Sequence, residues 1–224
     1  MILAVAASAF EADAQLVSTN TINFYKTNGQ ILPIDPTVKP VNAPASWSAL
    51  SRPWGTSFAV PFTHQPDDYT CGPTSLSMTM AHYGTVHDVP AIANYMSSIG
   101  NSPYTNGVGE STILAAVKHY GFSGAVITNG WDNLKAAIQN HLPCITHMYI
   151  SATNYPLYYP DGKPVYSSYT GGHYIVTCGL HADRNGNVDY VIVNDPAKGQ
   201  ALRYTSASFE KSWSAKNCHF IRLR

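Results

Sequence analysis

The chain has 224 residues, of which 45% are hydrophobic and 12% are charged. This composition is typical of a globular protein with one well-buried core, and it excludes a disordered chain or a solvated charge scaffold. Thirteen Lys and Arg residues balance thirteen Asp and Glu residues, and no run of basic residues occurs. The sequence therefore offers no electrostatic basis for binding nucleic acid.

The first residues read as part of a secretory signal. Residues 2–10 are small and apolar, and Ala12-Asp13-Ala14 matches an A-x-A processing site. A basic segment before the apolar run is missing, so a short terminal strand or helix is the alternative. No other apolar stretch approaches the roughly 18 residues needed to span a bilayer. We expect a partial signal peptide at 1–15, a secreted or periplasmic location and no stable membrane insertion.

Residues 16–56 are predicted to form an extended arm in front of a main domain at 57–224. The arm has no helical period and carries prolines among polar residues, with short strands expected at 22–25 and 29–34. Residues 57–62 alternate as in a strand that leads into the first motif. The prolines of the arm are Pro33, Pro36, Pro40, Pro44 and Pro53.

From Cys71 onward the pattern becomes helical. In residues 71–83, Leu76, Met80 and Tyr83 recur at helical spacing and predict one buried face, with Gly84 as the stop. Pro73 lies in the first turn, where its missing N–H costs nothing. Further helices are predicted at 88–98, capped by Asp88, at 110–120 and at 131–141.

After Pro143 the sequence changes to β-rich segments. Strands are predicted at 144–150, 172–179, 189–194 and 219–223. The Asp-Arg-Asn-Gly-Asn sequence at 183–187 predicts a hairpin turn, because Asn and Gly tolerate positive φ. Helices followed by strands predict an α+β fold with an antiparallel sheet.

The densest chemical signal surrounds Cys71. A thiol reacts as its thiolate, and the first turn of a helix favours an anion through its unpaired N–H groups and its dipole. Gly72 lets the chain bend tightly between loop and helix. Gln65, six residues before Cys71, is placed to donate its amide N–H to the oxygen of a tetrahedral intermediate, beside the Cys71 N–H. A buried structural cysteine that starts a core helix is the alternative.

His173 is the predicted general base for Cys71. It follows two glycines at the start of a predicted strand, so its ring can face a cleft. The unperturbed histidine pKa of about 6.5 suits proton transfer near neutral pH. His173 is preferred because the return strand of its hairpin ends at Asn194-Asp195-Pro196. The competing candidates are His64, His82 and His147.

Asp195 is predicted to orient His173. A catalytic imidazole is held in one tautomer by a hydrogen bond to its second nitrogen, usually from Asp or Asn. The hairpin brings the end of the 189–194 strand back beside the start of the 172–179 strand. Asn194 is the alternative orienting residue, and an ordinary Asn-Asp-Pro turn is the alternative without function.

The long segment 151–170 is predicted to contact substrate, because loops of this length in compact domains are usually functional. Tyr155 and Tyr169, together with Gly172, are the predicted substrate-binding residues. The segment and its neighbourhood supply an aromatic wall for a peptide or a glycan, with scattered surface tyrosines as the alternative. These tyrosines are Tyr149, Tyr155, Tyr158, Tyr159, Tyr166 and Tyr169.

The cysteine pattern argues against a structural metal. Four cysteines occur without a C-x-x-C pair, so a zinc site is not expected despite nine histidines. If Cys71 is a working thiol, the others permit at most one disulfide, and the sequence does not select the pair. The remaining cysteines are Cys144, Cys178 and Cys218. We expect no metal and no other cofactor.

These motifs resemble the papain-like cysteine peptidases and, more closely, the C39-like peptidases. The resemblance covers residues 60–224 in the correct order. It implies a papain-like fold with the nucleophile helix packed on a C-terminal sheet, Gln65 as oxyanion donor and a Cys71-His173-Asp195 triad. The matching positions are Gln65, Cys71-Gly72-Pro73, Ala81-His82-Tyr83-Gly84, Gly172-His173-Tyr174 and Asn194-Asp195-Pro196.

Some features depart from that family. Asp195 follows His173 by 22 residues, a longer interval than expected, and the arm before residue 57 matches nothing recognised. No transporter segment follows, so we do not expect the leader-peptide processing role of transporter-fused relatives.

The predicted function is hydrolysis of a peptide amide through a thioester, with a peptide or protein as substrate. An amidase or acyltransferase on the same site would share the chemistry up to the thioester. Such activities include peptidoglycan amide cleavage, transpeptidation and protein deamidation, which would make peptidoglycan a second candidate partner. A catalytically silent binding module and a metal-dependent hydrolase are the remaining alternatives.

Overall fold

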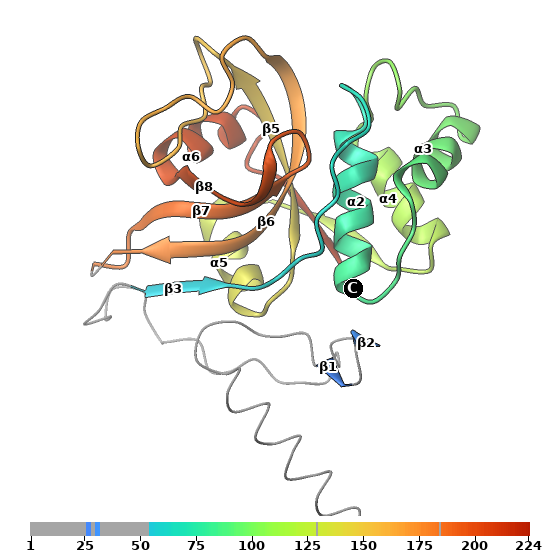
Figure 1. Cartoon of the computed structure of the whole chain (residues 1–224), viewed down its shortest axis with the longest axis horizontal. Helices are drawn as coiled ribbons and strands as arrows, with labels where there is room; N and C mark the ends of the chain where they lie inside the picture. Colours follow the sequence, from blue (N-terminus) through green and yellow to red (C-terminus); the bar gives the residue numbers. More distant parts are fainter. Residues whose placement is uncertain (1–25, 28–29, 32–53, 129, 184) are drawn as a thin grey trace, which may run out of the picture.

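The structure is a computed structural model. It describes residues 26–27, 30–31, 54–128, 130–183 and 185–224 (Figure 1). The predicted signal segment 1–15 and the predicted strand 22–25 lie outside these residues. Within the arm, β1 (Lys26–Thr27) and β2 (Gln30–Ile31) form an antiparallel pair. In the described part of the chain, no helix has the length and apolar character that crossing a bilayer requires.

The described residues form a seven-stranded antiparallel sheet, in agreement with the predicted α+β fold. The strand order is β4-β9-β5-β6-β7-β8, and β3 pairs with β6. The strands are β3 (Trp54–Ser57), β4 (Gly124–Ile127), β5 (Cys144–Ser151), β6 (Thr170–Ala182), β7 (Val188–Asp195), β8 (Gly199–Thr205) and β9 (Phe220–Leu223).

Strand β6 is the longest strand of the sheet and lies at its centre. Its residues 170–177 pair with β5, its residues 179–182 pair with β3, and β7 pairs along it from Val176 onward. The predicted hairpin turn between β6 and β7 is confirmed. Asp183 Oδ1 accepts the N–H groups of Asn185 and Asn187 at 2.8 and 2.9 Å, and Gly186 has a φ of 83°. The hairpin brings the end of β7 back beside the start of β6.

Helices α2, α3 and α4 lie together beside the sheet, while α5 and α6 pack against its strands (Figure 1). The predicted helices are confirmed within one or two residues at each end, and Asp88 caps α3 by accepting the Ala91 N–H at 2.8 Å. The helices are α2 (Cys71–His82), α3 (Val89–Ser98), α4 (Glu110–His119), α5 (Gly130–Gln139) and α6 (Ser206–Ser214).

The predicted strand at 57–62 is wrong beyond its first residue. Residues 58–62 are not a strand, because β3 ends at Ser57 and the last ladder-like bond runs from the Phe58 N–H to the Cys178 carbonyl at 3.1 Å. Pro61 has no N–H with which to continue a ladder. The alternation arises because Phe58 and Val60 are buried while Ala59 is exposed.

Helix α2 is buried on nearly all sides, and not on one face as predicted. Only Ala81 of its residues escapes full burial. Met78 belongs to a core between the sheet, α5 and α6, while Leu76 and Met80 belong to a second core with α3 and α4. The Ser75 hydroxyl also donates to the Tyr174 carbonyl of β6 at 3.2 Å. The helix that starts at Cys71 is therefore held between two cores and tied to the central strand.

The sequence analysis did not predict β4, β8 or α6. Each is short or largely polar, and its stability comes from its neighbours. In α6 only Ser208, Phe209, Ser212 and Trp213 are buried. In β8 only Tyr204 is fully buried, and the strand forms by pairing with β7. Such segments show little periodicity, because packing, and not intrinsic propensity, decides their structure.

Candidate active site

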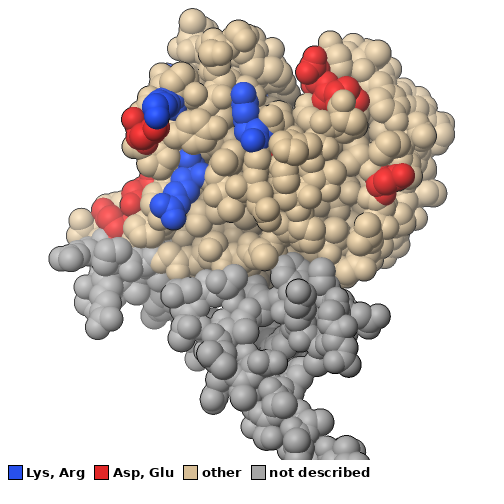
Figure 2. Space-filling view, in the orientation of Figure 1, with Lys and Arg blue, Asp and Glu red and all other residues tan. Residues whose placement is uncertain are grey.

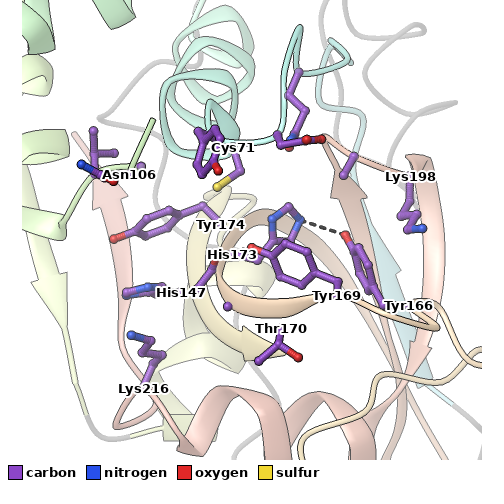
Figure 3. A pocket seen from close by; sticks show the side chains of 18 of the residues that line it. Cys71, Asn106, His147, Tyr166, Tyr169, Thr170, His173, Tyr174, Lys198 and Lys216 are labelled. Atoms are coloured by element: carbon purple, nitrogen blue, oxygen red, sulfur yellow. Dashed lines mark hydrogen bonds between the residues drawn. The ribbon is translucent and has the colours of Figure 1, made fainter. Parts of the chain in front are cut away.

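Cys71 is the first residue of α2 and lines a pocket of about 970 Å³ (Figure 3). The residue before it, Thr70, makes no side-chain cap hydrogen bond to the helix. Asp67 Oδ1 instead accepts the N–H groups of Tyr69 and Thr70, at 2.8 and 2.9 Å. This turn delivers the chain to the helix start and leaves the positive end of the helix dipole at Cys71, where it favours an anion.

Gly72 is required by close packing of its neighbours, in addition to the predicted bend. A Cβ placed on Gly72 would lie 2.5 Å from Val108 Cγ2 and 3.5 Å from Tyr174 Cδ2. Real Cβ atoms do not approach other atoms at 2.5 Å. The residue after the candidate nucleophile is therefore a glycine because the 106–109 loop and strand β6 close over the helix start.

The structure brings His173 and Asp195 together in the interior. His173 Nε2 lies 2.9 Å from Asp195 Oδ1, and their side chains are 3% and 0% exposed. Cys71 lies close enough to this ring to help raise its pKa. Because Nε2 faces Asp195, Nδ1 is the nitrogen that remains for the thiol. Figure 3 shows the Cys71 side chain and the His173 ring at the same part of the pocket.

Asp195 receives further hydrogen bonds that hold it as a carboxylate. Tyr204 donates to Oδ2 at 2.8 Å, and the Ala197 N–H donates to Oδ1 at 3.0 Å. Tyr166 donates to Oδ1 at 3.0 Å and to Oδ2 at 2.8 Å, and its oxygen lies 3.0 Å from His173 Nε2. Every oxygen of this buried carboxylate is thus satisfied, as a buried charge requires.

These contacts decide the charge states. Burial alone would lower the pKa of His173, but the Asp195 carboxylate, its hydrogen bond to the ring and the nearby Cys71 outweigh it and raise that pKa to about 10. Burial opposes ionisation of Asp195, yet His173, Tyr204 and Tyr166 lower its pKa below the ordinary value. Burial and the Asp195 charge raise the pKa of both tyrosines, so both remain phenols. At neutral pH the interior holds an imidazolium beside a carboxylate.

Tyr204 was missed by the sequence analysis, and Tyr166 was considered only as part of an aromatic wall. No motif marks Tyr204, since β8 itself was not predicted. Tyr166 could have been suspected from its place seven residues before His173 at the end of a long loop. What the sequence does not show is that two strands and a loop converge on one carboxylate.

Asn194, the alternative orienting residue, is engaged elsewhere. Its Nδ2 donates to the Val60 carbonyl at 3.0 Å, and its Oδ1 accepts the Ala201 N–H at 2.9 Å. It therefore ties the segment after β3 to β7 and β8 and does not contact the His173 ring. Of the two candidates, Asp195 is the one in contact with the His173 ring.

The three competing histidines also have other partners. His64 Nδ1 lies 3.3 Å from the Pro196 carbonyl oxygen, and His82 Nδ1 lies 3.2 Å from the Ala59 carbonyl oxygen. His147 lines the pocket, but its Nδ1 is 2.9 Å from Glu110 Oε1. Of these candidates, His173 is the one that the structure places against Cys71.

Gln65 lines the same pocket as Cys71. Its backbone N–H donates to the Pro196 carbonyl at 3.0 Å, and its Nε2 donates to the Asp67 carbonyl at 2.6 Å. A primary amide nitrogen carries two N–H groups, so a second donor remains. Its Oε1 is buried and has no hydrogen-bond partner among the described residues. The side chain is thus fixed beside Cys71 with one N–H to spare.

The predicted substrate-binding residues divide into two groups. Tyr169 and Gly172 line the pocket, and the Tyr169 hydroxyl donates to the Gly172 carbonyl at 2.6 Å. Tyr155 does not line it, because its backbone pairs with Ser151 and its ring packs edge-on against Tyr149 at 5.7 Å. Only residues 166–170 of the predicted loop reach the pocket. Other parts of the wall were not predicted to bind substrate, and they comprise Asp68, Tyr69, residues 106–109, His147, Ala197, Lys198 and Lys216.

All four cysteines are free thiols. Cys144 and Cys178 are buried in the core between the sheet, α5 and α6, and Cys218 packs at its edge. Burial raises the pKa of Cys178 to about 12 and also raises the pKa of Cys144 and Cys218. These three thiols are therefore poor nucleophiles at neutral pH, whereas Cys71 opens onto the pocket.

Comparison with known proteins agrees with this geometry. Residues 58–220 match the model of the Peptidase_C39 like family. No curated protein matches the chain. A crystal structure described as a C39-like peptidase from Bacillus anthracis is 20% identical, covers 74% of this chain and 94% of that chain, and has a TM-score of 0.55.

A second solved structure is the peptidase domain of Streptococcus ComA, a bifunctional ABC transporter of a quorum-sensing pathway. It is 20% identical, covers 74% of this chain and 98% of that chain, and has a TM-score of 0.52. At this identity the likeness shows the fold. Because the family match itself extends over most of the sequence, the chain belongs to the Peptidase_C39 like family and is a cysteine peptidase.

Proposed function

We propose that the protein hydrolyses a peptide amide bond through a Cys71-His173-Asp195 triad and a thioester intermediate. The observation that carries the proposal is the buried His173–Asp195 pair at 2.9 Å, with His173 and Cys71 both at the wall of the pocket. A positioned nucleophile, a base in contact with it and a carboxylate that holds the base are the elements of covalent acyl transfer.

The first half of the reaction forms the thioester. The Cys71 thiolate, beside protonated His173, attacks the carbonyl carbon of the scissile amide. The negative charge moves to the carbonyl oxygen, where the free N–H of Gln65 and the backbone N–H of Cys71 donate to it. The tetrahedral intermediate then collapses, the C–N bond breaks, and His173 gives its proton to the leaving amine.

The second half regenerates the enzyme. Neutral His173 takes a proton from a water molecule, whose oxygen attacks the thioester carbonyl. The C–S bond breaks, the acid product leaves, and Cys71 returns as the thiolate beside the imidazolium. Throughout both halves Asp195 keeps the ring in one orientation and favours its charged form, supported by Tyr166 and Tyr204.

A peptide or protein is the substrate that fits best. The pocket holds about 970 Å³ and runs past Cys71 between residues 106–109 and 166–172, which is large enough for several residues of an extended chain. The match to a peptidase family supports the same choice. No contact in the pocket favours peptidoglycan over a peptide, or an amine acceptor over water.

Domain organisation and location remain predictions from the sequence. We propose residues 57–224 as the peptidase domain, preceded by an arm at 16–56 and a signal segment at 1–15, with export to a secreted or periplasmic location. Trp54–Ser57 already pairs with β6, so the sheet includes residues just before this boundary. Mass spectrometry of the processed amino terminus after expression with an export pathway tests this division.

The proposed reaction is tested with the wild-type chain and two variants, Cys71→Ala and Cys218→Ala. Each is incubated with a mixed peptide library and with purified peptidoglycan, and products are read by mass spectrometry. We expect new peptide termini from the wild type and from Cys218→Ala, none from Cys71→Ala, and no release from peptidoglycan. Cleavage that persists in Cys71→Ala, or release from peptidoglycan alone, would contradict the proposal.

A further inference from the structure

Two basic side chains face Gly172, the residue directly before His173. A Cβ on Gly172 would lie 3.4 Å from His147 Nε2 and 4.0 Å from Lys216 Nζ. Both side chains line the active-site pocket. Figure 3 shows Tyr174, His147 and Lys216 following one another away from Cys71, and the Tyr174 and His147 rings stack at 4.2 Å. The Lys216 ammonium thus lies close to the residue before His173, where glycine adds no side chain of its own.

The backbone fixes Lys216 in this place. The Lys216 and Cys218 N–H groups both donate to the Trp213 carbonyl, at 2.9 and 3.2 Å, and the His219 N–H donates to the Lys216 carbonyl at 3.3 Å. Asn217 has a φ of 55°, which asparagine tolerates, and Cys218 has a φ of 52°, which residues other than glycine and asparagine rarely adopt. Such strain persists only where the surrounding contacts enforce it, and it is concentrated at functional sites.

The Lys216 ammonium has no ion-pair partner in the described ranges, and its Nζ lies 5.7 Å from the centre of the Tyr149 ring. The Glu110 carboxylate is bound by His147 at 2.9 Å and lies 3.8 Å from His219. Asp68 also lines the pocket but makes no ion pair with Lys216. Burial, and to a smaller extent the charge of Lys216, lower the pKa of His147 despite its bond to Glu110.

The second lysine of the pocket is differently placed. Lys198 Nζ lies 4.3 Å above the centre of the Tyr166 ring, where a cation–π contact already favours it. Charged side chains are few on the face drawn in Figure 2, with wide uncharged areas between them. Of the two lysines that line the pocket, Lys216 is therefore the one placed to meet an anionic group at Gly172.

We propose that Lys216 forms a carboxylate-binding subsite at Gly172, so that the enzyme prefers peptides with an Asp or Glu side chain beside the cleaved bond. The Lys216 ammonium donates to the carboxylate, while the His147 ring, whose Nδ1–H is held by Glu110, forms the wall beside it. This subsite rests on the proposed peptidase function and adds a substrate class to it. A substrate peptide with Gln in place of Glu at this position keeps the shape of the side chain and loses its charge.

The test compares cleavage of a peptide library by the wild type, Lys216→Met and Lys198→Met. We expect Asp and Glu to be enriched at one position near the cleaved bond, by about tenfold, the size of one partly exposed charge-assisted hydrogen bond. Lys216→Met removes the enrichment, whereas Lys198→Met retains it. No enrichment in the wild type, or enrichment that survives in Lys216→Met, overturns the subsite.

A binding measurement separates this inference from the proposed reaction. Cys71→Ala protein, with and without Lys216→Met, is titrated with a fluorescent peptide taken from a cleaved sequence, or from the library if none is cleaved, in Glu and Gln forms. Tighter binding of the Glu form that depends on Lys216 supports the subsite even if no peptide is cleaved. Equal binding of the two forms refutes it, even if cleavage proceeds normally.

Discussion

The Tyr166 hydroxyl donates to both carboxylate oxygens of Asp195, at 3.0 and 2.8 Å, from a loop that also lines the pocket. Replacing it by Tyr166→Phe leaves a buried carboxylate with one donor fewer, which costs about 1–3 kcal/mol of folding free energy. The same loss raises the pKa of Asp195, because this hydrogen bond lowers it. We therefore expect the acidic limb of the pH profile of kcat/KM to move to higher pH.

Tyr159→Phe is the matched control for Tyr166→Phe. The Tyr159 ring packs against Tyr204 at 5.8 Å, and its hydroxyl makes no hydrogen bond to Asp195. Its removal should leave the acidic limb in place. A Tyr166→Phe variant that loses stability without any displacement of the pH profile would show that Tyr166 only packs.

The buried His173–Asp195 pair predicts how stability depends on pH. The pKa of His173 is raised from 6.5 to about 10, so its contribution is complete below pH 6.5 and is lost as the pH rises through about 10. The pKa of Asp195 is lowered from 3.8, so its contribution is present above pH 3.8 and is lost as the pH falls through the lower, folded-state value. Urea unfolding between pH 5 and 10 should show a decline on the alkaline side.

Asp195→Asn should abolish this alkaline decline, because burial without the carboxylate lowers the pKa of His173. The comparison variant is Asp189→Asn, which breaks the exposed His181–Asp189 contact at 2.7 Å. That pair is open to solvent, so we expect its loss to change the pH dependence of stability very little. Equal effects of the two substitutions would contradict a special role for the buried pair.

Iodoacetamide should modify Cys71 selectively at pH 7. Cys71 opens onto the pocket beside His173, whereas burial raises the pKa of the other three thiols. Peptide mapping should find the adduct on Cys71, and His173→Ala should slow its formation by about tenfold or more, because the imidazolium partner is gone. Labelling of Cys218 before Cys71 would contradict the assignment of Cys71 as the reactive thiol. The Cys71→Ala variant is the control that lacks this thiol.

Gly72→Ala should disturb the start of α2. The new methyl group would meet Val108 Cγ2 at 2.5 Å, and overpacking of this kind costs about 1–3 kcal/mol. Thermal unfolding and kcat/KM should both fall. Adding Val108→Ala removes the clashing methyl group and should restore much of the loss. If the double variant is as impaired as Gly72→Ala, then the backbone bend, and not the contact with Val108, is what requires glycine.

Gln65→Ala should lower kcat with little change in KM. Removing one donor to the oxyanion typically costs about 10²–10³ in kcat, because the interaction is made mainly in the transition state. Gln65→Glu keeps the size of the side chain and replaces the N–H donor by a carboxylate, so it should be at least as impaired. A loss smaller than about threefold in both variants would remove Gln65 from the mechanism.

Much of the fold could be read from the sequence where local patterns and packing agree. Helix α3 carries its own cap in Asp88, and α2 is followed by its own stop in Gly84. The β6–β7 hairpin was specified by its Asn and Gly turn residues. The polar strand β8 and the short strand β4 could not be read, because they depend on neighbours far away in the chain.

The sequence alone determined the kind of chemistry, since Gln65, Cys71, His173 and Asp195 each stand in a recognisable local context. Only the tertiary structure decided what surrounds them: Tyr166 and Tyr204 on one carboxylate, and Lys216 opposite Gly172. A short motif encodes the residue that reacts, because its backbone setting is local. Side chains that tune its charge and select its substrate arrive from distant strands and loops, and only packing in three dimensions brings them together.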